Sequence, residues 1–383
     1  MYQTRKHGFS WPLFILMATI TFMAILSELM PSGLLPEMAN GFGINESQAG
    51  GFVGQYAIAS ALFGIPIVSA TVEWDRKKLL MLLLIGFAIA NITIGLVSSY
   101  WMAIAARIIG GICAGALWPM ISAYGMSLVS PDEHGKAVAV IMAGTTVGMS
   151  IGLPITTWIG TTFGFHIAFF AMGIFIIIIA VLCQIFLPHV VGEKRIKSNS
   201  PLTMLKNKGV LIVILLTVLA VAANYGVYTY ITNLVSDINY PSIGLAQILF
   251  GIGSIASVLI AGRFIDQHLQ AVGIGMLVAA GIAMALFYAV NITFVHHISF
   301  ALWGIGFGAL VTLFQTAVTR QVTSGTAVAT SLQSAAFNFS IMIGSTVGGW
   351  LLASGSSASI LMMAMILLVI ATIISLFSKK TLA

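Results

Sequence analysis

The feature that most constrains this chain is a series of apolar segments, each about as long as a helix needs to cross a membrane. Such a helix takes about 20 mostly apolar residues. Only 7% of the residues are charged, against about 25% in ordinary soluble domains, so charged side chains are too few to cover a soluble surface of this size. The sequence therefore excludes a cytosolic enzyme, a nucleic-acid-binding protein and a secreted domain, and it indicates a protein of the lipid bilayer.

Twelve such segments predict an all-α membrane protein with twelve spans. Their approximate ranges are 12–35, 48–69, 79–98, 101–125, 136–160, 165–187, 209–233, 243–264, 270–291, 297–318, 326–353 and 356–377. The longest connection, 188–208, is polar and basic. We therefore predict six helices in residues 1–187, a cytoplasmic linker over 188–208, and six helices in residues 209–383. The first apolar run continues to Glu28 without a small-residue cleavage site, so we expect no cleavable signal peptide.

The basic residues predict the orientation, because Lys and Arg concentrate on the cytoplasmic side of membranes. If the N-terminus is cytoplasmic and the spans alternate, 15 of the 16 basic residues fall on that side and none falls in the outer loops. They are Arg5, Lys6, Arg76, Lys77, Lys78, Lys136, Lys194, Arg195, Lys197, Lys206, Lys208, Arg263, Arg320, Lys379 and Lys380. Both termini are then cytoplasmic, and the net charge of +6 requires no nucleic-acid partner.

Two ionisable residues are predicted to lie clearly inside the bilayer, Glu28 in the first span and Arg107 in the fourth. Glu28 lies about 24 Å from the cytoplasmic start of its span, and Arg107 about 9 Å from the outer start of its own, at 1.5 Å per residue. In a hydrocarbon core about 30 Å thick the two depths nearly coincide. We therefore expect the two side chains to pair or to share a cavity.

Two interpretations of this pair are open. Glu28 and Arg107 are a static link between two helices, or Glu28 is a proton-binding carboxyl group with Arg107 as its counter-charge. Charges inside membranes are costly and tend to mark transport pathways, which favours the second interpretation for Glu28. Burial disfavours a charged carboxylate and a nearby arginine stabilises it, so a glutamate subject to both can take up and release a proton.

Glycine and proline predict irregular or closely packed spans. The first span continues after Glu28 through Pro31, Gly33 and Pro36, which should break it, either to line a cavity or to end the helix early. In the fourth span Gly111, Gly115 and Trp118 share the face of Arg107. In the fifth span glycines recur every fourth residue before a proline, a pattern that allows close helix packing with a bend. These residues are Gly144, Gly148, Gly152 and Pro154.

Other polar side chains within spans are candidate ligands of a substrate cavity, although such groups often only join helices by hydrogen bonds. Together with Trp118 they are Gln55, Tyr56, Asn224, Tyr225, Tyr228, Gln315 and Asn338. Two turns on the cytoplasmic side repeat an Asp–Arg pair between the halves, Asp75 with Arg76 and Arg263 with Asp266. Repeated halves around a midplane site are typical of transporters.

Signals for other chemistry are missing from the sequence. The GIGFG run at 304–308 lies within a span and follows no strand, and there is no GxxxxGK[ST] motif, so no nucleotide site is predicted. His296 and His297 lack metal-ligand spacing. Cys113 and Cys183, both in apolar runs, are interpreted as small buried side chains. We expect no enzyme activity, no metal and no cofactor.

Several of these segments resemble one family. SELMPSGLLPEMA, EWDRKKLL, RIIGGICAG and the run from Gly144 to Pro154 are similar to motifs of the major facilitator superfamily. Within it the chain resembles the twelve-span drug:proton antiporters, and most of all the sugar-efflux and arabinose-efflux-like exporters, over about residues 10–378. The loop motif lacks its usual glycines, and Leu153 separates Gly152 from Pro154, so the match departs from the family pattern at two places.

The resemblance implies two pseudo-symmetric six-helix bundles that open a central cavity alternately to each side of the membrane. It also implies export of small molecules such as drugs or sugars in exchange for protons, with Glu28 as the proton site and Arg107 as the counter-charge. The expected setting is a monomer in a bacterial inner membrane, with protons, a small molecule and lipid as its partners. A proton-coupled importer and a non-transporting membrane sensor are the alternatives.

Overall fold

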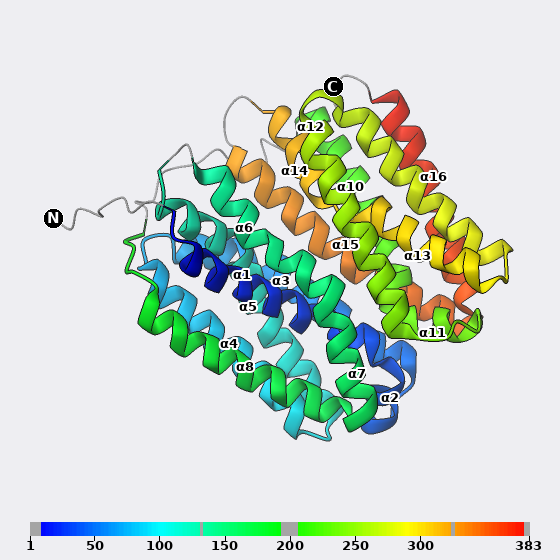
Figure 1. Ribbon diagram of the computed structural model, residues 1–383, viewed down its shortest axis with the longest axis horizontal. Helices are drawn as coiled ribbons and strands as arrows, with labels where there is room; N and C mark the ends of the chain where they lie inside the picture. The colour runs from blue at the N-terminus through cyan, green and yellow to red at the C-terminus, as the bar shows by residue number, and fades with distance from the viewer. Residues whose placement is uncertain (1–8, 131–132, 193–205, 323–325, 379–383) are drawn as a thin grey trace.

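The computed structural model describes residues 9–130, 133–192, 206–322 and 326–378, and these residues form helices and no strand (Figure 1). Twelve of the described segments are helical, long enough and apolar enough to cross a membrane. The prediction of an all-α protein with twelve spans is therefore confirmed, with every predicted boundary within four residues of the observed segment. The linker residues 193–205 lie outside the described residues.

The helices fall into two sequential groups in Figure 1, one coloured blue to green and the other green to red. The first group comprises α1 (Trp11–Leu29), η1 (Met30–Gly33), α2 (Leu35–Phe42), α3 (Glu46–Ala70), α4 (Arg76–Leu96), α5 (Tyr100–Ser127), α6 (His134–Val147), η3 (Gly148–Gly152), α7 (Leu153–Phe163) and α8 (Phe165–Phe186). The second comprises α10 (Lys208–Thr229), α11 (Ile231–Asp237), α12 (Ile243–Ala289), α13 (Thr293–Phe307), α14 (Leu310–Arg320), α15 (Thr326–Ser354) and α16 (Ser357–Phe377).

Three spans are irregular at residues that disfavour a regular helix. The first changes to a 3₁₀ turn at η1, where Pro31 cannot continue the backbone hydrogen bonds. The fifth widens to a π turn at η3, directly before Pro154. α12 contains two spans, and its backbone leaves the helical region at His268 (φ −136°, ψ 42°), near the start of the second span. The break that the sequence predicts in the first span is thus observed.

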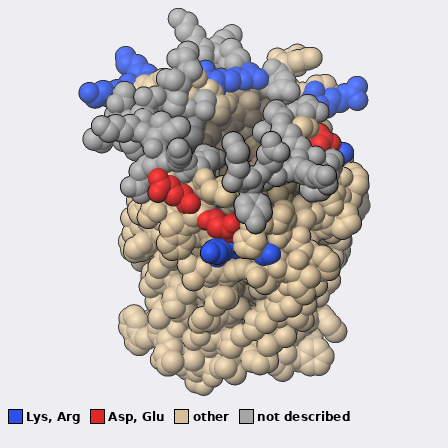
Figure 2. Space-filling model, turned by 90° about the vertical axis from the view of Figure 1, so that its left-hand side faces the viewer, with Lys and Arg blue, Asp and Glu red and all other residues tan. Residues whose placement is uncertain are grey.

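The two ends of the molecule differ in charge. The end at which the first span begins and the last span ends is called the terminal end here, and the other the opposite end. Figure 2 shows Lys, Arg, Asp and Glu in the upper part and near the middle of the visible face, and a broad surface without charged residues below them. Such an uncharged band suits the hydrocarbon layer of a membrane.

The main contacts between the groups involve α3 and the fifth span. α3 packs against α15, and α12 packs against α7 and η3.

Within the first group, the glycines of the fifth span let it approach α1 closely. A Cβ built on Gly144 would overlap the carbonyl oxygen of Ala18, and one on Gly148 would lie 2.5 Å from Ile25 Cγ2. The Thr21 hydroxyl donates a hydrogen bond to the Ile141 carbonyl (2.5 Å) across the same contact.

We expect Gly144→Ala to destabilise the protein, because the new methyl group meets backbone that cannot rotate away. Overpacking of this kind costs roughly 1–3 kcal/mol. The measurement is the melting temperature of the detergent-solubilised chain. Gly281→Ala is the matched control, since a Cβ there meets open space. Equal melting temperatures for the two variants would contradict the close contact between α1 and α6.

Candidate functional site

Arg107, in the first half of α5, is almost completely buried, with 2% of its surface exposed. Its guanidinium group donates hydrogen bonds to three backbone carbonyl oxygens: Nη1 to Ser27 (2.5 Å), Nη2 to Glu28 (2.8 Å) and Nε to Phe52 (3.0 Å). The guanidinium carbon also lies 4.3 Å from the centre of the Tyr56 ring. Arg107 therefore connects α5 to α1 and α3, and its charge is met by carbonyl dipoles and an aromatic face.

Pro31 explains why a carbonyl of α1 is available to Arg107. In a regular helix the Ser27 carbonyl would accept a hydrogen bond from the backbone N–H of residue 31. Proline has no N–H, and the last helical bond of this kind runs from Met30 N to Leu26 O. The Ser27 carbonyl is left without its usual partner and bonds the arginine instead. A cation at this position also suits the negative end of the helix dipole.

The Glu28 side chain is buried, with 3% of its surface exposed. Among the described residues it makes no hydrogen bond and no ion pair within 4.0 Å, although its backbone carbonyl binds Arg107. It interacts electrostatically with Arg107, with Tyr56 and with Tyr225. Because Tyr225 belongs to α10, the carboxyl group of Glu28 lies near the contact between the two helix groups. The predicted proximity of Glu28 and Arg107 is observed, but a direct carboxylate–guanidinium bond is not.

Polar neighbours that sequence reasoning missed support this part of α1. Asn91 of α4 donates a hydrogen bond to the Ser27 hydroxyl (2.9 Å) and a second to the Phe87 carbonyl (2.8 Å). A lone buried asparagine in the third span was the available signal. The carbonyl partners of Arg107 gave no signal, because every residue has a carbonyl group.

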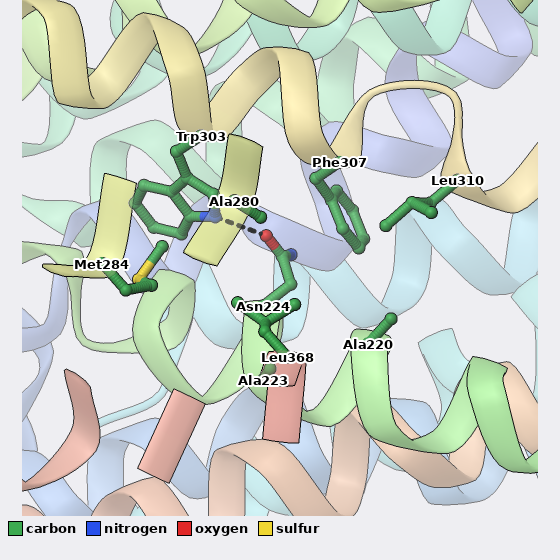
Figure 3. A pocket seen from close by; sticks show the side chains of 9 residues that line it. All are labelled: Ala220, Ala223, Asn224, Ala280, Met284, Trp303, Phe307, Leu310 and Leu368. Carbon is green, nitrogen blue, oxygen red and sulfur yellow. Dashed lines mark hydrogen bonds between the residues drawn. The ribbon is translucent and has the colours of Figure 1, made fainter. Parts of the chain in front are cut away.

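The predicted cavity residues of the seventh span do not all face the same way. Asn224 accepts a hydrogen bond from Trp303 Nε1 (2.7 Å) and lines a small pocket with a volume of about 10 Å³, roughly the room of one water (Figure 3). Tyr228 packs against the rings of Phe250 and Trp303. The structure thus places Asn224 and Tyr228 inside the second helix group, whereas we expected them in a central cavity. Their role as substrate ligands remains a prediction.

The remaining cavity candidates are scattered. Tyr56 is buried against Arg107, and its hydroxyl has no hydrogen-bond partner among the described residues. Trp118 is half-buried, and Gln55 and Gln315 are exposed. Asn338 is half-buried and donates a hydrogen bond to Ser334 O of its own helix (3.0 Å). Of the predicted set, Tyr56 and Tyr225 are the two that interact electrostatically with Glu28.

At the terminal end, the predicted turn residues Asp75 and Arg76 make their hydrogen bonds within the first half of the chain. Asp75 caps α4 by accepting a hydrogen bond from Lys78 N (2.9 Å), and it pairs with His189 Nδ1 (3.1 Å). The backbone N–H of Arg76 bonds the Val190 carbonyl (2.8 Å). Arg263 lies on the surface of α12, and the side chain of Asp266 lies outside the described residues. Asp75 thus binds within its own half of the chain.

Tyr230 joins the two helix groups at the opposite end. Its hydroxyl donates a hydrogen bond to the Ser345 carbonyl of α15 (2.8 Å), and its ring occupies the space left by Gly50 of α3 and Gly349 of α15. Asn233 of α11 donates a hydrogen bond to the carboxylate of Glu46 at the start of α3. These contacts hold the two groups together at the opposite end.

No three His, Cys, Asp or Glu side chains lie close enough together to hold a metal ion, in the part of the chain that the structure describes. Cys113 and Cys183 are both buried and free.

Twelve spans in two sequential groups, with a buried carboxyl group and an arginine near their contact, define a membrane transporter. The model of the Major Facilitator Superfamily matches residues 17–331, and the chain belongs to this family. Family and fold therefore indicate a protein that moves small molecules, rather than an enzyme.

Solved structures of transporters share the fold. A mutant form of the nucleoside transporter NupG has a TM-score of 0.76 at 16% identity, with 97% of this chain and 100% of that chain covered. A bacterial homologue of the human lysosomal transporter Spinster, inward-facing and occupied, has a TM-score of 0.76 at 16% identity, with 97% of each chain covered. The human organic anion transporter MFSD10 has a TM-score of 0.71 at 17% identity, with 95% of this chain and 98% of that chain covered. At these identities the similarity shows the fold alone.

We expect Arg107→Ala to lower the free energy of unfolding by roughly 3–5 kcal/mol, because it leaves buried carbonyl groups of α1 and α3 without a donor. Arg107→Lys should recover only part of the loss, since an ammonium group cannot reproduce the planar guanidinium geometry. Thermal unfolding in detergent measures both. Arg263→Ala, on an exposed surface, is the control. Wild-type stability of Arg107→Ala would contradict the structural importance of these hydrogen bonds.

Glu37, in α2 at the opposite end, should make stability depend on pH. Burial raises the pKa of Glu37 above its ordinary value, and the nearby Glu46 carboxylate adds to the increase. A carboxyl group whose pKa is higher in the folded state stabilises that state most at low pH, and this contribution is lost as the pH rises through the folded pKa. We therefore expect Glu37→Gln to gain stability over wild type as the pH rises above about 4.3. Melting curves from pH 4 to 8 test this, with Glu133→Gln as the control. A difference in melting temperature between Glu37→Gln and wild type that stays the same at every pH would contradict the prediction.

Proposed function

We propose that this transporter is a proton-coupled exporter of the twelve-span drug:proton antiporter class, similar to the sugar-efflux exporters. The observation that carries the proposal is the state of Glu28. A carboxyl group with 3% of its surface exposed has no ion-pair partner among the described residues, although an arginine lies beside it. Charged groups are expensive at this depth, so a carboxyl group left unpaired is suited to bind a proton.

Arg107 supports this role because its own charge is already balanced. Three carbonyl oxygens and the Tyr56 ring surround the guanidinium group. When Glu28 is protonated its negative charge disappears, but the charge of Arg107 is still stabilised by these carbonyl groups and by the Tyr56 ring. Arginine does not lose its proton in proteins, so Arg107 acts as a fixed charge near the proton site.

The proposed cycle couples this proton to movement of the two helix groups. A proton from outside neutralises Glu28, the substrate leaves, and the groups close at the opposite end and open at the terminal end. Substrate binding from the cytoplasm then displaces the proton. The membrane potential contributes about 2.3 kcal/mol per elementary charge and 100 mV. No cofactor is needed, because the proton gradient supplies the free energy.

The orientation proposed for this cycle follows from charge. Both termini and the basic terminal end face the cytoplasm, as the distribution of Lys and Arg indicates. We propose a monomer in a bacterial inner membrane, on the strength of the family resemblance. The direction of transport also rests on that resemblance. The alternative is a proton-coupled importer with the same fold, and the experiment must distinguish the two.

We expect Glu28→Gln to abolish proton-coupled export, because glutamine keeps the size of the side chain but cannot exchange a proton. The assay uses inside-out vesicles with a proton gradient reported by a pH-sensitive dye. Sugars, nucleosides, cationic dyes and chloramphenicol-like drugs are added one at a time. A substrate should collapse the gradient with wild type and with the control Glu133→Gln, but not with Glu28→Gln.

Two results would contradict the proposal. Full coupled export by Glu28→Gln would remove Glu28 from the mechanism. Substrate flux in the direction of proton flow would identify an importer.

A further inference from the structure

The contact between α7, η1 and α12 contains buried polar side chains that have no hydrogen-bond partner among the described residues. Gln247 of α12 is completely buried, and neither its amide nitrogen nor its amide oxygen makes a hydrogen bond to any residue that the structure describes. The hydroxyl groups of Thr157 in α7 (2% exposed) and Ser32 in η1 (0% exposed) are also buried without a hydrogen bond. None of these residues belongs to the proton site around Glu28.

Two of these side chains meet at one point of the backbone. A Cβ built on Gly33 would overlap the Thr157 hydroxyl and lie 3.1 Å from Gln247 Nε2. Thr157 and Gly33 belong to the first helix group, and Gln247 belongs to the second. Thr157 and Gln247 therefore meet across the contact between the groups, and Ser32 is the chain neighbour of the glycine at which they meet; the three residues are here called the polar cluster.

The polar row continues along the same face of α12. Gly251 lies one turn after Gln247. A Cβ built on it would lie 2.4–2.6 Å from atoms of Ser150, so Gly251 packs directly against Ser150. The Ser150 hydroxyl is buried and lacks a partner as well. Apolar residues of the same shape would fill this contact without unpaired groups. The polar groups contribute nothing favourable while the contact is closed, so their use belongs to a state in which the two groups separate here.

The chemistry of the polar cluster defines what it can bind. Gln247 offers two N–H donors and a carbonyl acceptor, and each hydroxyl can donate and accept. The cluster contains no charged side chain. A neutral solute with both donors and acceptors satisfies these groups, whereas a lipophilic cation leaves them unpaired.

We infer that Ser32, Thr157 and Gln247 form a hydrogen-bonding subsite for a neutral polar solute that carries both donor and acceptor groups. The subsite becomes accessible when α7 and η1 separate from α12. The inference rests on the proposed transport function, whose substrate class it specifies. It does not depend on proton coupling, since Glu28 takes no part in it.

Binding to the purified full chain in lipid nanodiscs tests the inference without a proton gradient. The probes are three neutral solutes, arabinose, lactose and uridine, and one cation, tetraphenylphosphonium. Isothermal titration calorimetry measures the binding of each. We expect at least one neutral solute to bind wild type, and Gln247→Leu and Thr157→Val each to weaken that binding about tenfold or more, the effect of one lost hydrogen bond. Thr157→Ser, which keeps the hydroxyl group, should retain affinity.

Thr161→Val, one turn further along α7, is the control for packing. Melting temperatures establish that each variant is folded. Equal affinity of a neutral solute for wild type, Gln247→Leu and Thr157→Val would overturn the inference and assign the cluster to bound water. Binding of tetraphenylphosphonium alone, or of none of the four probes, would also overturn it. Because no gradient is present, loss of proton coupling leaves these results unchanged.

Discussion

The hydrogen bonds of Arg107 to the end of α1 are the interaction on which the rest of this structure depends. Pro31 removes the N–H group that the Ser27 carbonyl would otherwise bind, and Arg107 takes its place (2.5 Å). The same guanidinium group bonds the carbonyls of Glu28 and Phe52. Three spans thus meet around one buried cation, and the break in α1 is stabilised by the charge that it attracts.

This arrangement has a consequence for Glu28. An arginine that is already satisfied by carbonyl groups and by the Tyr56 ring does not need a carboxylate partner. The backbone carbonyl of Glu28 is bound by Arg107, while its carboxyl group has no ion-pair or hydrogen-bond partner in the described part of the chain and interacts electrostatically with Tyr225 of the other helix group. In the proposed function this carboxyl group takes up the proton, while the hydrogen bonds of Arg107 anchor the helix that carries it.

The sequence predicts those features that depend on local composition or on depth in the membrane. The twelve spans follow from hydropathy, the break in α1 from Pro31, and the proximity of Glu28 and Arg107 from counting residues along two spans. The partners of Arg107 do not follow, because backbone carbonyls have no signature in the sequence. The orientation of Asn224 and Tyr228 depends on how α10 is rotated against Trp303. Gln247 and Thr157 are uncharged polar residues within apolar spans, and only the structure shows that they meet at Gly33.

Proton binding by Glu28 is the central claim, and infrared difference spectroscopy of the reconstituted chain between acidic and alkaline buffer tests it most directly. A protonated carboxylic acid in an apolar setting has a carbonyl band that a carboxylate lacks. We expect this band in wild type and in Glu133→Gln and its loss in Glu28→Gln. Identical difference spectra for wild type and Glu28→Gln would show that Glu28 does not take up a proton.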